Sequence, residues 1–77
     1  MNELGRISNQ DLRYEIRRHL KVIEDYESGI ALMLWDEFHA ANAKQDRAAL
    51  LNLFVRVSGR VREIAAYEDV DLYDLGL

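Results

Sequence analysis

The sequence predicts an all-α fold, a small three-helix bundle, and three observations support this. The chain has 77 residues and no proline, so no residue in it is incompatible with the interior of a helix. Before residue 68, no stretch alternates apolar and polar residues over the length of a strand. In three successive segments, apolar residues recur every three or four positions, which is the period of an amphipathic helix.

The first helix is expected to begin near Asn9. Ser8 and Asp11 form a weak capping box, in which the Ser8 hydroxyl accepts a hydrogen bond from a free backbone N–H of the first turn. Arg13, Arg17 and Lys21 flank the apolar stripe of this segment. The stripe consists of Leu12, Ile16, His19, Leu20, Ile23, Tyr26 and Ile30.

Ser28 and Gly29 are expected to divide the middle of the chain. Gly29 would close the first helix and Ser28 would cap the second, whose apolar face holds Ala31, Leu34, Trp35, Phe38 and Ala41. In the alternative, one helix continues over residues 9–43 for roughly 50 Å, and the fold is a long helical hairpin completed by dimerisation. We favour the broken form.

The third helix is expected to begin after Asp46 and to end near Tyr67. The Asp46 carboxylate is a good N-cap, because it can accept from the free N–H groups of the following turn. Gly59 lies off the apolar face, where it permits either a close backbone contact or simple exposure to solvent. That face consists of Leu50, Leu53, Phe54, Val57, Val61, Ile64 and Ala65.

Residues 1–67 are expected to form a single helical domain, and residues 68–77 an acidic-apolar C-terminal tail. The net charge of −4 comes entirely from this tail, because the first 67 residues hold ten acidic and ten basic side chains. The tail either docks its leucines on the bundle or binds a partner. The predicted core consists of Leu12, Ile16, Leu20, Ile23, Ile30, Leu34, Trp35, Phe38, Leu50, Phe54, Val57, Val61 and Ile64.

Four apolar side chains lie outside the predicted stripes: Leu32, Met33, Leu51 and Val55. Large exposed apolar patches on soluble proteins usually mark interaction sites, so we predict that these residues mediate self-association as a homodimer. In the alternative, a small bundle surrounds its central helix on more than one side and covers them.

The residues required for catalysis or metal binding are scarce. The chain has no cysteine and two histidines, whereas structural zinc sites usually need about four such ligands. Glu15 and His19 are one turn apart, and Asp36 and His39 are spaced as in di-iron bundles, but the second such pair is missing. No serine lies in a hydrolase-type turn, and the four glycines never cluster to hold a phosphate. We therefore predict no enzyme, no catalytic residue, no metal and no cofactor.

Two binding functions remain. The favoured one is a non-enzymatic protein–protein interaction module, a small acidic inhibitor or adaptor that occupies a partner's basic surface. Its candidate residues are Glu24, Asp25, Glu27, Asp36, Glu37, Glu68, Asp69, Asp71 and Asp74. The alternative is a nucleic-acid-binding helical protein, with phosphate contacts from Arg13, Arg17, Lys21, Arg56 and Arg60.

The location expected from the sequence is cytoplasmic, without a membrane partner. The first eight residues include Glu3 and Arg6 and hold no apolar run, so no secretory signal is expected. The longest apolar run covers residues 30–35, far below the roughly 18 residues of a membrane span. The absence of cysteine agrees with a reducing compartment.

Overall fold

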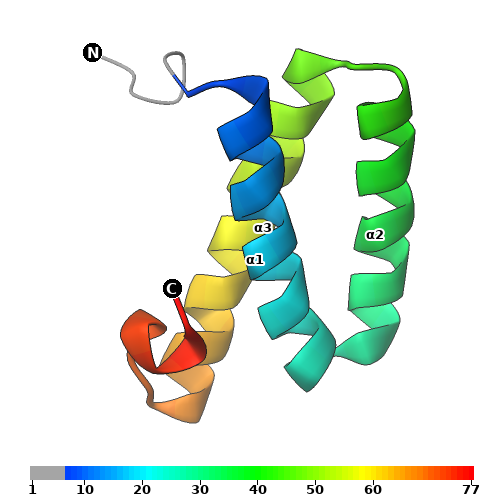
Figure 1. The fold of residues 1–77 in the computed structure, drawn as a ribbon. Coiled ribbons are helices and arrows are strands. Elements are labelled where there is room, and N and C mark those ends of the chain that lie inside the picture. The colour runs from blue at the N-terminus through cyan, green and yellow to red at the C-terminus, as the bar shows by residue number, and fades with distance from the viewer. Residues whose placement is uncertain (1–6) are drawn as a thin grey trace.

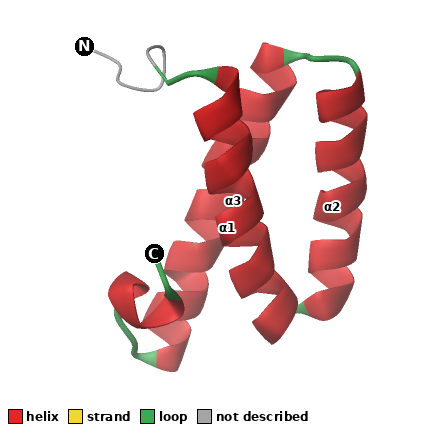
Figure 2. Ribbon diagram, in the orientation of Figure 1, coloured by secondary structure: helices red, strands yellow, loops and turns green. Residues whose placement is uncertain are grey.

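A computed structural model describes residues 7–77, and they form three helices joined by tight reversals (Figure 1). Residues 1–6, on which most of the expectation about a secretory signal depends, lie outside the described residues. The helices are α1 (Asn9–Tyr26), α2 (Ser28–Ala43) and α3 (Arg47–Glu68), followed by a short 3-10 helix at Leu72–Leu75. No strand interrupts them within residues 7–77, as Figure 2 shows. The predicted three-helix bundle is confirmed.

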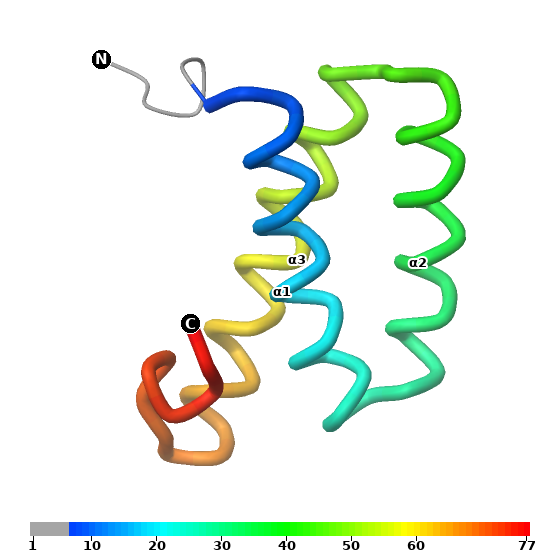
Figure 3. Tube along the Cα trace, in the orientation of Figure 1, coloured from blue at the N-terminus to red at the C-terminus, as the bar shows by residue number. Residues whose placement is uncertain are grey.

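The arrangement is an up-and-down bundle in which α1 packs most extensively against α3. Figure 3 shows the path of the chain: α1 descends, α2 ascends beside it, and α3 descends behind α1. The N-terminal end of α2 therefore lies at the same end of the bundle as the C-terminal ends of α1 and α3. The C-terminal segment turns back from that end toward α1 (Figure 1).

The predicted helix caps at Ser8 and Asp46 are confirmed. The Ser8 hydroxyl accepts a hydrogen bond from the Asp11 backbone N–H at 3.0 Å, and α1 begins at Asn9. An Asp46 carboxylate oxygen accepts from the Ala49 N–H at 3.1 Å, and α3 begins at Arg47. These caps satisfy donors that have no partner inside the helix.

The break between α1 and α2 exists, but it lies at Glu27, so the predicted roles of Ser28 and Gly29 were wrong. Glu27 leaves helical geometry at φ −142° and ψ 67°. Its backbone N–H still donates to the Ile23 carbonyl, and its own carbonyl accepts from Ala31. One residue thus ends the first helix and begins the second, which excludes the continuous helix of the hairpin alternative.

Ten of the thirteen predicted core residues are buried, and three are not. Ile30 is 42% exposed, because the chain reverses at Glu27 and Ile30 no longer continues the stripe of α1. Trp35 and Phe54 are half-buried at the edge of the core. Among residues 7–77, five further residues are buried: Val22, Ala31, Ala41, Leu53 and Ala65.

The C-terminal segment packs against the bundle. Leu75 and Leu77 lie against the core, and the Arg18 guanidinium donates to the Gly76 carbonyl at 2.9 Å. Val22 follows Arg18 by one helical turn and is buried. Within residues 7–77, no helix is long and apolar enough to cross a membrane.

Candidate partner-binding site

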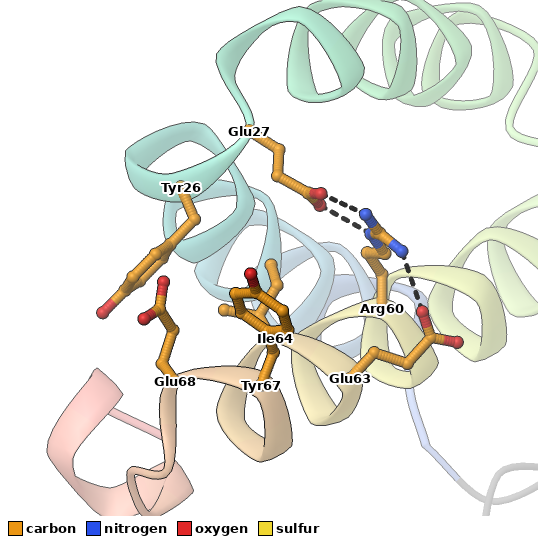
Figure 4. Close-up of a pocket in the computed structure, with 7 residues that line it drawn as sticks. All are labelled: Tyr26, Glu27, Arg60, Glu63, Ile64, Tyr67 and Glu68. Carbon is orange, nitrogen blue, oxygen red and sulfur yellow. Dashed lines mark hydrogen bonds and ion pairs between the residues drawn. The ribbon is translucent and has the colours of Figure 1, made fainter.

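A cleft of about 380 Å³ opens where α1 and α3 end. Five of its lining residues come from the last turns of α3. They recur three or four positions apart along the sequence, which places them on one face of the helix. The other two are Tyr26, the last residue of α1, and Glu27 at the reversal (Figure 4). The lining residues are Tyr26, Glu27, Arg60, Glu63, Ile64, Tyr67 and Glu68.

Arg60 is held on one side of the cleft by two carboxylates. Its Nε donates to Glu27 Oε1 at 2.5 Å, and its Nη2 donates to the second oxygen of the same carboxylate. Its Nη1 donates to Glu63 Oε2 at 2.8 Å. Hydrogen bonding to Arg60 lowers the pKa of Glu27, and the bonds to Glu27 and then Glu63 raise the pKa of Arg60. Glu27 and Arg60 therefore both stay charged near neutral pH.

The other side of the cleft is aromatic and apolar. Ile64 is buried at its base, while the rings of Tyr26 and Tyr67 are exposed. In Figure 4 the carboxylate of Glu68 points toward the ring of Tyr26. Such a mixture of apolar base, aromatic walls and a few charged groups is typical of sites that bind a ligand or a partner side chain.

The acidic residues predicted for partner binding fall into two groups. Most lie at the end of the bundle where α1 and α3 finish, which we call the acidic end (Figure 1). Asp36 and Glu37 lie instead within α2, and Glu37 accepts hydrogen bonds of 3.1 and 2.6 Å from Arg56. The acidic end consists of Glu24, Asp25, Glu27, Glu63, Glu68, Asp69, Asp71 and Asp74.

The basic residues predicted for nucleic-acid binding also divide. Arg56 of α3 forms an ion pair with Glu37, and Arg60 forms one with Glu27. Arg13, Arg17 and Lys21 are spaced by four on α1 and share one edge of that helix. The Arg17 guanidinium lies 5.4 Å from the ring centroid of Phe38, so this edge faces α2. The structure therefore does not gather the five residues on one surface.

Neither histidine belongs to a group of metal-ligating side chains within residues 7–77. His19 Nδ1 is 2.6 Å from the Glu15 carbonyl oxygen, and its ring meets Phe54 edge-on at 5.5 Å. His39 is exposed, and its ring stacks on Trp35 at 5.7 Å. Among residues 7–77, no group of three or more His, Cys, Asp and Glu side chains is arranged to hold a metal ion.

The four residues predicted for self-association differ in exposure. Leu32 and Met33 of α2 and Val55 of α3 are exposed. Leu51 is half-buried and packs against the core, so its side chain is largely covered within the monomer. The exposed apolar surface is therefore smaller than the sequence predicted.

The sequence prediction named Glu27 and Glu68 but did not name Glu63 or Tyr67 as site residues. Their spacing from Arg60 on one face of α3 could have indicated a common surface. Comparisons of the chain with protein-family models, with curated proteins and with solved structures found no match.

Proposed function

We propose that the chain is a protein–protein interaction module, a small acidic inhibitor or adaptor whose acidic end occupies a basic surface of a partner protein. The observation that carries the proposal is the unbalanced charge of the cleft. Three carboxylates line it, and among the lining residues Arg60 is the only base, already bonded to two of them. The charge left over is negative and requires a positive counterpart in any tight complex.

The surroundings of the cleft are negatively charged as well. Glu24 and Asp25 are exposed in the last turn of α1, directly before Tyr26 and Glu27, which line the cleft. The C-terminal ends of α1 and α3 lie here with one N-terminal end, that of α2, so the helix dipoles sum to a partial negative charge. Such a field attracts a basic surface and speeds the encounter with it.

The experiment is affinity capture with matched pairs of neutral substitutions. The test variant carries Glu24→Gln with Asp25→Asn, outside the cleft, and the control carries Asp36→Asn with Glu37→Gln on α2. Both pairs are adjacent and exposed, so each variant loses two surface charges, and the control also loses the ion pair of Glu37 with Arg56. We expect a basic protein from an extract of the source organism to bind the parent chain and the control, and to be lost from the test variant.

The captured protein is then purified and its complex with the parent chain is reconstituted at defined stoichiometry. Binding should weaken as salt rises, because the interaction is between opposite surface charges. Capture that both pairs of substitutions reduce equally, or that neither reduces, would contradict the proposal.

A second copy of the chain is the other partner we propose, on the evidence of the exposed side chains of Leu32, Met33 and Val55. Large apolar side chains open to solvent on a small bundle favour association, because burial removes them from water. Light scattering at micromolar concentration should give the mass of a dimer. A monomer mass at all concentrations would rule this partner out.

Nucleic acid is the second candidate function, and the basic edge of α1 is the observation that favours it. Residues 7–77 contain no ion pair from Arg13, Arg17 or Lys21 within 4.0 Å of a carboxylate, so these cations are open to phosphates. A titration against duplex DNA at several salt concentrations tests it. Affinity that falls steeply with salt would support phosphate binding, and no binding even at low salt would exclude it.

A further inference from the structure

The geometry points to a specific ligand for the cleft: the guanidinium group of an arginine side chain, supplied by the partner protein. This inference rests on the proposed function, because it names the group through which the partner would contact the acidic end. It depends on the charge, the free acceptors and the aromatic walls of the cleft.

Charge distinguishes this cleft from a second one in the described part of the chain. The second cleft, of about 340 Å³ between α2 and α3, is lined by two acids and two bases, Glu37, Asp46, Lys44 and Arg56, and is neutral. The first has three acids and one base and keeps an excess of two negative charges. Of these two clefts, the first therefore gains more electrostatic energy from a bound cation.

The hydrogen-bond acceptors that remain in the cleft suit a planar cation. Both Glu27 oxygens and Oε2 of Glu63 accept from Arg60. The Glu68 carboxylate accepts no hydrogen bond from residues 7–77, so both of its oxygens can receive a pair of parallel N–H groups. A guanidinium presents such a pair in fixed geometry, and a carboxylate binds it in a bidentate manner.

The walls favour guanidinium over ammonium. The rings of Tyr26 and Tyr67 line the cleft together with buried Ile64, which leaves an apolar surface around the free carboxylate (Figure 4). A guanidinium is weakly hydrated and stacks on aromatic rings, whereas the ammonium of lysine is compact and strongly hydrated. The transfer of an arginine head group into this cleft therefore loses less hydration free energy than the transfer of a lysine ammonium group.

The test is a titration of the isotope-labelled full chain with Nα-acetyl-arginine amide, followed by NMR chemical shifts. We expect saturable shifts at Tyr26, Tyr67 and Glu68, with weak affinity because a single side chain is the ligand. Nα-acetyl-citrulline amide has the same shape without the charge, and it should bind at least about fivefold more weakly. Nα-acetyl-lysine amide should bind about two- to fivefold more weakly.

Two substitutions and one control complete the test. Tyr67→Ala and Glu68→Gln should each weaken the arginine probe about two- to fivefold. Tyr73→Ala is the control, because Tyr73 is 86% exposed and Tyr67 is 89% exposed, so neither substitution disturbs the core. Tyr73 lies outside the cleft and its loss should leave the affinity unchanged.

The inference would be overturned by equal affinity for the arginine and citrulline probes, by equal affinity for the arginine and lysine probes, or by shifts that Tyr67→Ala does not change. The two proposals fail separately. A captured protein that depends on Glu24 and Asp25, together with an arginine probe that does not enter the cleft, leaves the proposed function and removes the arginine site. If instead the arginine probe enters the cleft but no captured protein depends on Glu24 and Asp25, the proposed function is removed and the cleft remains a guanidinium site.

Discussion

Two valines of α3 allow the packing of the bundle to be tested with the same substitution. Val57 is 0% exposed and Val55 is 56% exposed, and the two are separated by one residue in the same helix. Val57→Ala and Val55→Ala each remove two methyl groups. A difference between the two variants therefore reports on burial rather than on helix propensity.

The expected magnitude follows from the methyl groups removed. Two buried carbons contribute about 1.6 kcal/mol at roughly 0.8 kcal/mol each, and the cavity left behind raises the loss for Val57→Ala to about 2–2.5 kcal/mol. At Val55 the side chain stays largely in water, and the better helix propensity of alanine offsets the remaining loss. The change there should stay within about 0.5 kcal/mol.

The assay is urea denaturation followed by circular dichroism at the helical band. A single core of this size supplies roughly 3–5 kcal/mol, so Val57→Ala should remove about half of the free energy of unfolding and lower the melting temperature by about 10–20 °C. Val57→Asp should prevent folding, because it buries a charge without a partner. A native spectrum for Val57→Asp, or equal losses for the two alanine variants, would refute the placement of α3.

Three further substitutions give predictions from local features. Gly59→Ala should raise the free energy of unfolding by up to about 1 kcal/mol in urea, because nothing lies within 4 Å of the added carbon; a loss would indicate an unseen close contact. Asp46→Ala should lower it by about 1 kcal/mol, measured by thermal melting, because the Ala49 N–H loses its cap; no change would contradict the cap. Arg60 lowers the pKa of Glu27 below its ordinary value of 4.5, so the stability this carboxylate contributes is present above that value and is lost as pH falls through the folded value. The advantage of the parent chain over Glu27→Gln in urea should therefore shrink as the pH falls below 4.5, and an advantage that stayed constant would contradict the ion pair.

The features predicted correctly from the sequence are those that depend on neighbouring residues. Ser8 and Asp46 cap the turns that follow them, and this requires only a side-chain oxygen three residues before an N–H group. The apolar period of α3 likewise predicted that Val57 and Val61 would be buried. Ile30 was placed in the core because its spacing continues that of α1, and the reversal at Glu27 changed its direction.

The candidate site was only partly predictable, because it joins residues far apart in the chain. The sequence identified Glu27 and Glu68 as acidic, but Arg60 was predicted to bind phosphates. Its partner Glu27 is 33 residues away, and only the packing of α1 against α3 brings the two side chains together. Val22 lies outside the predicted stripe of α1 and is nevertheless buried, which the apolar period of that helix did not predict.

The reversal at Glu27 and the charge of the cleft have a common origin. A glutamate at this position ends α1 without a side-chain cap for α2, because its carboxylate extends to Arg60 instead. The same bond removes Arg60 from the surface that could meet phosphates and, together with Glu63, neutralises it. Within residues 7–77 the carboxylate of Glu68 has no counter-ion, and it lines the cleft together with two tyrosine rings. The ion pair that joins the helices therefore also determines the sign of the charge that a partner must carry.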